Sequence, residues 1–149
     1  MEAIILIGIQ ASGKTSFYRE RFFDTHLRLS LDMLRTRHRL HLLLQACLAA
    51  KQPFVLDNTQ VLRQERLGPI AQARAAGFSV QGYFFEPRPE RALAWNAQRA
   101  GRALIPPKGL LGTLKRLERP TPEEGYDRLW RVEIDAAGAF VVAPWQPPP

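Results

Sequence analysis

The segment GIQASGKT, residues 8–15, decides the fold of this chain. Glycine, four residues and then Gly-Lys-Thr form a Walker A pattern, in which a strand leads through a glycine-rich loop into a helix. The apolar run at residues 3–8 predicts a central buried strand, and residues 13–21 predict the helix. Gly8 and Gly13 allow backbone dihedral angles and a close approach that a side chain would prevent. The pattern therefore stands in the structural context that phosphate binding requires.

The types of residue in this loop predict a nucleoside triphosphate site. Backbone N–H groups of the loop and the N-terminus of the next helix form an anion-binding nest for the β-phosphate. Lys14 is expected to bridge the β- and γ-phosphates, and the Thr15 hydroxyl to ligate Mg²⁺. We predict ATP as the donor, with other nucleoside triphosphates as alternatives, and Mg²⁺ as the cofactor. The predicted nucleotide-binding residues are Gly8, Gln10, Ala11, Ser12, Gly13, Lys14, Thr15 and Ser16.

The composition of the chain narrows the class of partner. It has 149 residues, enough for one domain with a real core, and a formal net charge of +7. The basic charge is mostly arginine, which favours nucleic acid because a guanidinium group pairs bidentately with phosphate. The alternative is that a GC-rich genome has enriched the surface in arginine. Every apolar run falls short of the ~20 residues that span a bilayer, so no membrane partner is expected. Cys47 is the one cysteine, and we predict a cytoplasmic location.

Short apolar runs alternate with helical patterns along the chain, which is typical of βαβ units around a parallel sheet. We predict an α/β, three-layer P-loop kinase fold at residues 1–142, with a five-stranded, mostly parallel sheet and a short helical lid at about residues 99–107. A proline-rich tail is predicted at residues 143–149. The predicted strands lie at residues 3–8, 26–30, 54–56, 79–85 and 129–134, and residues 140–142 form a hairpin with the last of them.

The predicted helices carry start and stop signals of their own. Ser30 is placed to N-cap a helix that runs to about residue 50. Pro69 predicts a kink or a break in the helix at residues 62–76, which ends at Gly77. Apolar residues at helical spacing predict a core stripe in the first of these helices, made of Leu40, Leu43, Leu44, Cys47 and Leu48.

The segment after the second predicted strand carries residues suited to a phosphoryl acceptor. Asp32 lies in the first turn of its helix, at the carboxyl end of the strand, where open α/β sheets bind ligands. Helical spacing puts Asp32, Arg35 and Arg39 on one side of that helix. Asp32 is placed to accept a proton from an attacking hydroxyl, and Arg35 to bind a phosphate or the charge that develops in transfer. The alternative is that Asp32 complements the helix dipole and pairs with Arg35 at the surface.

Two further groups of residues complete the predicted site. Asp57 closes the third strand and is predicted to hold Mg²⁺ together with Thr15; the alternative is a turn or cap role in Asp-Asn-Thr. Arg99 and Arg102 flank Gly101 on a hinge-like segment and are predicted to close over the triphosphate as part of a lid. Alternatively, they are cations that favourably end a helix. The predicted catalytic residues are Lys14, Asp32, Arg35, Arg99 and Arg102.

From residue 3 to about residue 134, the chain resembles the polynucleotide 5′-hydroxyl kinase family of P-loop phosphotransferases. The resemblance rests on residues 8–15, Ser30-x-Asp32-x-x-Arg35, Leu56-Asp57-Asn58-Thr59, Asn96-x-x-Arg99-x-x-Arg102 and Pro122-Glu-Glu-Gly-Tyr126. It implies that Asp32 is the general base for a 5′-hydroxyl and that Arg35 binds a phosphate of the acceptor. It also implies that Arg99 or Arg102 contacts the donor, on a five-stranded parallel sheet of the adenylate-kinase style. The implied partners are 5′-OH ends of DNA or RNA, together with phosphatase or ligase modules.

Three functions are consistent with these residues. The first is transfer of the γ-phosphoryl group of ATP to the 5′-OH of DNA or RNA, with basic residues between positions 28 and 39 along the nucleic-acid backbone. The second is a kinase for a small metabolite, antibiotic or nucleotide sugar that uses the same base and lid. The third is an ATP-binding regulatory or nucleic-acid-binding module with slow or no transfer.

Overall fold

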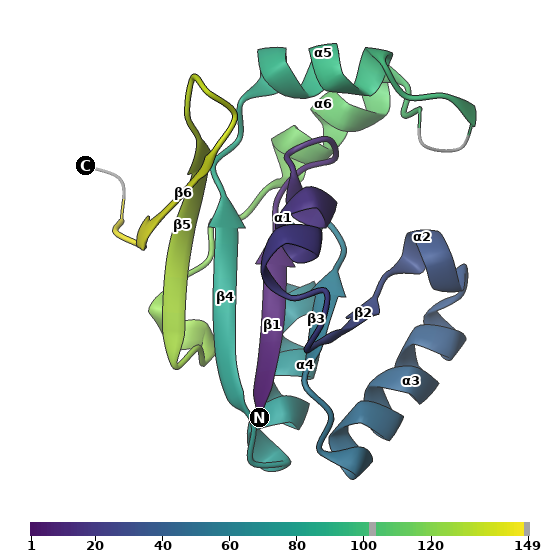
Figure 1. Cartoon of the computed structure of the whole chain (residues 1–149), viewed down its shortest axis with the longest axis vertical. Coiled ribbons are helices and arrows are strands. Elements are labelled where there is room, and N and C mark those ends of the chain that lie inside the picture. Colours follow the sequence, from purple (N-terminus) through teal and green to yellow (C-terminus); the bar gives the residue numbers. More distant parts are fainter. Residues whose placement is uncertain (102–103, 148–149) are drawn as a thin grey trace.

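The computed structural model describes residues 1–101 and 104–147. Its centre is one six-stranded sheet with the strand order β2-β3-β1-β4-β5-β6 (Figure 1). The first five of these pair in parallel, and β6 runs antiparallel to β5 as the second arm of the predicted hairpin. The α/β prediction is therefore confirmed, with the hairpin arm as a sixth strand. The strands are β1 (Glu2–Ile7), β2 (Leu27–Leu29), β3 (Phe54–Asp57), β4 (Ser79–Phe85), β5 (Arg128–Ile134) and β6 (Phe140–Pro144).

Helices cover both faces of the sheet and its carboxyl edge. In Figure 1, α1 lies in front of the central strands, α4 lies behind them, and α5 and α6 lie together beyond the carboxyl ends of β1 and β4. The described part of the chain contains no helix with the length and apolar character needed to cross a bilayer. The helices are α1 (Lys14–Arg21), α2 (Leu31–Leu34), α3 (Arg37–Ala50), α4 (Arg63–Ala75), α5 (Pro89–Ala97), α6 (Pro107–Arg116) and the 3₁₀ helix η2 (Pro122–Glu124).

The core explains why β1 is apolar throughout. Successive side chains of a strand point to opposite faces, so Ile5 packs on the side of α3 and α4 while Ile4 packs on the side of α1. Phe17 of α1 lies at the centre of the second of these clusters, in contact with the ring of Phe85. A strand covered on both faces must be apolar at every position, and such a strand leads straight into the phosphate loop.

The helix predicted from Ser30 to about residue 50 is two helices, which corrects the placement of the acceptor residues. Ser30 caps α2 as predicted, since its hydroxyl accepts a hydrogen bond from the Asp32 N–H at 3.2 Å. Arg35 then ends α2 with a φ of 75°, and the Thr36 hydroxyl begins α3 by accepting from the Arg39 N–H at 3.1 Å. A second N-cap thus restarts the helix. Asp32, Arg35 and Arg39 therefore do not share one helix face, contrary to the prediction.

Two other predictions about helices need correction. The core stripe of α3 is narrower than expected: Leu44 is buried, but Leu43 is 42% exposed. Helix α4 continues across Pro69, so the predicted break does not occur. Proline removes only its own N–H from the hydrogen-bond ladder, and the rest of α4 remains paired and packed.

At the other end of the chain, β6 reaches Pro144, and the Trp145 N–H donates to the Leu129 carbonyl at 3.0 Å, inside the segment predicted as a tail.

Candidate active site

The phosphate loop has the backbone that its sequence predicts. Ala11 and Gly13 both have positive φ angles, 57° and 94°. Residues in this left-handed region turn neighbouring N–H groups inward and form an anion-binding concavity. Gly8 is required for space, because a Cβ there would lie 3.0 Å from the Phe85 Cβ and 3.0 Å from the Ser12 hydroxyl. The loop is therefore shaped for an anion at the N-terminus of α1.

Lys14 is folded back into this loop. Its Nζ donates hydrogen bonds to the carbonyl oxygens of Gly8 at 2.9 Å and Ile9 at 2.7 Å. Burial is the main cause that lowers the pKa of Lys14, to about 8, and Arg99 lowers it further, while Asp57 and Asp32 oppose the shift. An ammonium group held this way is poised to bind phosphate, because a bound anion restores the charge partner that burial denies it.

Nucleotide affinity is expected to fall as the pH rises through about 8, because only the protonated form of Lys14 attracts phosphate. Above that pH each further unit removes about 90% of the charged form, so the Kd for ADP rises roughly tenfold per unit. Equilibrium binding of a fluorescent ADP between pH 7.5 and 9.5 measures this. The Lys14→Arg variant is the control, since a guanidinium stays charged over that range. An equal pH dependence in Lys14→Arg would assign the titration to another group.

Thr15 and Asp57, the predicted magnesium ligands, lie side by side. The Thr15 hydroxyl donates a hydrogen bond to Asp57 Oδ2 at 2.9 Å. Parallel pairing of β1 and β3 brings the ends of both strands to one edge, which places Asp57 beside the loop. Magnesium prefers such oxygen ligands and usually takes few of them from the protein. The donor set therefore fits Mg²⁺ bound together with a nucleotide.

Arg28 is a site residue that the sequence prediction missed. Its Nε donates to Asp57 Oδ2 at 2.7 Å, and one Nη donates to the Thr15 hydroxyl at 3.3 Å. This contact turns Arg28 inward, away from the nucleic-acid track predicted for it. The signal was present, because alternation in β2 points Arg28 to the face opposite Leu29, on the side of α1.

A cavity of about 440 Å³ opens beside the phosphate loop and brings most of the predicted residues together. Asp32 and Arg99 line it with Lys14, Thr15 and Asp57. Its volume lies within the range of small-molecule sites. Of the predicted residues that the structure describes, Gly8 and Arg35 are not part of its lining. Arg35 is exposed at the end of α2, and Arg102 lies outside the residues that the structure describes.

The strand ends fix the position of Asp32. The Leu31 N–H donates to Asn58 Oδ1 at 2.9 Å, so the first turn of α2 is tied to the end of β3. Ser30 caps the same turn through the Asp32 N–H. These two contacts hold Asp32 next to the segment that carries Asp57. Asn58 is thus a positioning residue for the candidate base.

Two polar side chains, Asn96 and Gln10, tie α5 and α6 to neighbouring segments. Asn96 of α5 is buried; it accepts a hydrogen bond from the Ile105 N–H at 2.8 Å and donates another to the Ile105 carbonyl. This pair closes the segment that carries Arg99. Gln10 of the phosphate loop donates to the Thr113 hydroxyl of α6 at 2.9 Å. Its Oε1 is the one buried side-chain oxygen or nitrogen without a hydrogen-bond partner in the described ranges, and Gln10 is among the residues that line the cavity.

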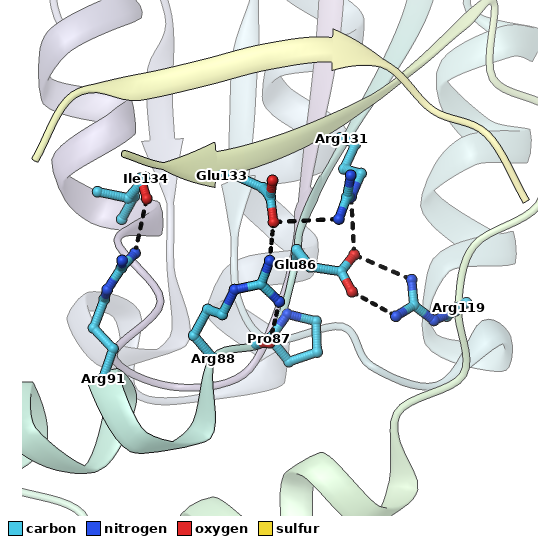
Figure 2. A network of polar contacts seen from close by, with 8 residues as sticks. All are labelled: Glu86, Pro87, Arg88, Arg91, Arg119, Arg131, Glu133 and Ile134. Carbon is cyan, nitrogen blue, oxygen red and sulfur yellow. Dashed lines mark hydrogen bonds and ion pairs between the residues drawn. The ribbon is translucent and has the colours of Figure 1, made fainter. Parts of the chain in front are cut away.

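A network of charged residues anchors both ends of the α5–α6 pair to the sheet (Figure 2). Glu86, directly after β4, accepts from Arg119 at 2.6 Å and from Arg131 at 3.1 Å. Glu133 of β5 accepts from Arg131 and from Arg88, which precedes α5. Burial disfavours the charge on Glu86, but hydrogen bonds from Arg119 and Arg131 outweigh it and hold the pKa of that carboxyl below its usual range. The network borders a second, smaller hollow beside the phosphate loop, between α5 and the end of β5.

Replacing Glu86 with glutamine is expected to lower the free energy of unfolding by about 1 kcal/mol at pH 7, since the partner arginines are partly exposed. A carboxyl whose pKa is lower in the folded state stabilises above its unfolded pKa. The difference between wild type and Glu86→Gln should therefore be complete above pH 4.5 and disappear as the pH falls below it. Urea titrations at several pH values measure it. Glu20→Gln is the control, because its carboxylate is 58% exposed. A pH-independent difference would contradict this account.

A buried ion pair supports the turn that follows β3. Arg66 and Glu124 are both fully buried and joined by two hydrogen bonds, at 2.7 and 3.0 Å. A third donor of Arg66 reaches the Gln60 carbonyl at 2.8 Å. Gln60 has a φ of 47°, and its side chain donates to the carbonyls of Leu6 and Leu56. The Arg66–Glu124 pair thus holds the strained turn at Gln60. The side chain of Gln60 in turn bridges β1, which leads into the phosphate loop, and β3, which carries Asp57.

Comparison with known proteins identifies a family and similar folds for this chain. Residues 24–120 match the AAA domain family AAA_33. The structure resembles Kti12 of Chaetomium thermophilum, solved in complex with ADP-AlF3, with a TM-score of 0.67, 18% identity, and coverage of 91% of this chain and 92% of that one. It also resembles a gluconokinase of Sinorhizobium meliloti 1021, with a TM-score of 0.63, 18% identity, and coverage of 89% and 82%. A third similar structure is that of the PezAT toxin-antitoxin system of Streptococcus pneumoniae. It has a TM-score of 0.66 and 12% identity, with coverage of 93% of this chain and 70% of that one.

At these identities the similar structures establish the fold alone. A search among curated proteins gave no match. The chain has the P-loop kinase-like fold of a nucleotide-binding domain. Because the family match covers more than half of its length, the protein belongs to the AAA domain family AAA_33.

Proposed function

We propose that this protein transfers the γ-phosphoryl group of ATP to the 5′-hydroxyl end of a polynucleotide. The observation that carries the proposal is the cavity that Asp32 lines together with Lys14 and Thr15 of the phosphate loop. A carboxylate opposite a phosphate loop is the arrangement that a kinase needs for an alcohol acceptor.

The donor half of the reaction rests on the loop and the lid. Lys14 binds the β- and γ-phosphates, and Arg99 on the same cavity neutralises charge on the transferred group. Mg²⁺, held through the Thr15 hydroxyl with Asp57 beside it, supplies further charge neutralisation when bound. The acceptor oxygen forms a bond to the γ-phosphorus while the bond to the bridging oxygen breaks. Asp32 takes the hydroxyl proton, and ADP leaves.

The acceptor half of the proposal rests on the positive charge that follows Asp32 in the chain. Arg35, Arg37 and Arg39 are all exposed around the junction of α2 and α3, directly after Asp32 in the chain. Together with the net charge of +7, they favour an acceptor that carries several phosphates. A small hydroxylated acceptor is the second candidate, because the fold resembles that of a gluconokinase.

The test incubates the protein, MgCl₂ and γ-labelled ATP with matched 5′-OH and 5′-phosphate oligonucleotides of DNA and RNA, and separately with gluconate. Label is expected on the 5′-OH strands only. Oligonucleotide affinity should fall with salt, at a log–log slope of about −0.7 per phosphate contacted. Label on gluconate, or ATP turnover without label on any oligonucleotide, would contradict the polynucleotide proposal. The first would favour the small-molecule kinase, and the second an ATP-binding module.

A further inference from the structure

Arg28 donates hydrogen bonds to two of the oxygen atoms that a magnesium ion would use, Thr15 Oγ1 and Asp57 Oδ2. The predicted ligands, Thr15 and Asp57, are the same two groups that accept hydrogen bonds from its guanidinium. A third contact, to the Ser30 hydroxyl at 3.4 Å, holds the end of the side chain in place. The Arg28 side chain is 19% exposed and that of Asp57 is 3% exposed.

The hydrogen-bond capacity of these atoms makes the competition specific. The Thr15 hydroxyl has one proton, which it donates to Asp57, and its lone pairs accept from Arg28. A metal ligated by this hydroxyl needs a lone pair on the same oxygen, at about 2.1 Å. The guanidinium and the metal are both cations, so they repel each other at this distance. Contact of Arg28 with Thr15 and ligation of Mg²⁺ by Thr15 therefore oppose each other.

Burial explains why an arginine stands at this position. A carboxylate as buried as Asp57 is costly to bury without a charge partner or hydrogen-bond donors. Arg28 supplies both at 2.7 Å. A bound metal supplies a second positive charge beside Asp57. The contact between Arg28 and Thr15 must then open, because the metal is ligated by the same hydroxyl.

We propose that the guanidinium group of Arg28 competes with Mg²⁺ for Thr15 and Asp57. The proposal rests on the nucleotide-binding part of the proposed function. It follows that Arg28 supports nucleotide binding without metal, and that it raises the Mg²⁺ concentration needed to tighten that binding. Removing the charge of Arg28 should therefore weaken nucleotide binding without Mg²⁺ and lower the Mg²⁺ concentration that tightens this binding.

The experiment titrates MgCl₂ into the protein with a fluorescent ADP and compares wild type with Arg28→Ala and Arg28→Gln. Both variants should bind ADP more weakly without Mg²⁺. The Mg²⁺ midpoint should fall by roughly tenfold or more, the effect of one competing hydrogen bond between charged groups. The Arg63→Ala variant removes an exposed arginine at the start of α4 and should keep the wild-type midpoint. An unchanged or higher midpoint in both Arg28 variants would overturn the proposal.

A second readout separates this proposal from the proposed function. In the absence of nucleotide, MgCl₂ should raise the Tm of Arg28→Gln by more than that of the wild type, because the metal replaces a lost counter-charge. An equal rise in the two proteins would contradict the competition. Failure of the wild type to bind any nucleotide would instead refute the donor site, and this Tm comparison would still decide the role of Arg28.

Discussion

Replacing Asp32 with asparagine is expected to lower kcat for phosphoryl transfer by about 100- to 10,000-fold, the range that general bases contribute. The Kd for ADP should change little at pH 7, because the phosphate loop keeps its own contacts. Asparagine preserves the shape of the side chain and removes its negative charge and its ability to accept the proton. Single-turnover transfer of label from ATP to a 5′-OH oligonucleotide measures the rate.

The geometry supports so large an effect. Asp32 lines the cavity with Lys14 and Thr15, and its place on α2 is fixed from two sides, by the Ser30 cap and by Asn58. Its charge also reaches Lys14, where it opposes the lowering of the lysine pKa. Asp24→Asn is the matched control, since Asp24 is exposed in the connection between α1 and β2. A transfer rate in Asp32→Asn equal to that of Asp24→Asn would exclude Asp32 as the base.

Replacing Glu124 with glutamine is expected to lower the free energy of unfolding by about 3–5 kcal/mol, the cost of leaving a buried charge without its partner. Glu124 accepts two hydrogen bonds from Arg66, one from the Tyr126 hydroxyl at 2.9 Å and one from the Thr121 N–H at 3.1 Å. Burial and the charge of Glu124 raise the pKa of Tyr126, so its hydroxyl stays protonated and donates. Glutamine keeps the volume but leaves the Arg66 guanidinium without its counter-charge.

Urea unfolding of Glu124→Gln, Arg66→Met, their double variant and the control Glu123→Gln isolates the pair. The exposed neighbour in Glu123→Gln should leave stability close to that of the wild type. The double variant Arg66→Met/Glu124→Gln removes both charges and should be more stable than Glu124→Gln alone. Additive losses in the double variant would show that the two side chains stabilise the fold separately. Because Arg66 also holds the Gln60 carbonyl, the folded single variants should also bind ADP more weakly.

Local sequence signals predicted the phosphate loop and its place in the fold. The glycine pattern and the apolar strand before it are contiguous, so one segment specifies both the loop and its position. The partnership of Thr15 with Asp57 was also predictable, although the two are 42 positions apart. Parallel strands bring their carboxyl ends to one edge, so a carboxylate that closes a neighbouring strand must lie near the loop.

The parts that sequence reasoning missed depend on competing local signals or on distant pairing. The break between α2 and α3 results from Thr36, whose capping hydroxyl outweighed an otherwise continuous helical pattern. Arg28 has its role only because β2 and β3 are neighbours, which the sequence does not state. Arg66 looks like an ordinary surface arginine on a helix, and its partner lies 58 positions away. For the two arginines the missing information was which elements pack together.

The central claim, that the loop at residues 8–15 binds a nucleoside triphosphate through Lys14, is tested most directly by equilibrium binding of fluorescent ATP to wild type and Lys14→Met. Methionine keeps the length and apolar stem of the side chain without its charge. The account predicts saturable, Mg²⁺-dependent binding by the wild type, weakened roughly 100-fold or more in Lys14→Met, since charged hydrogen bonds to two phosphates are lost. Equal affinities in the two proteins, or no binding by the wild type, would contradict it.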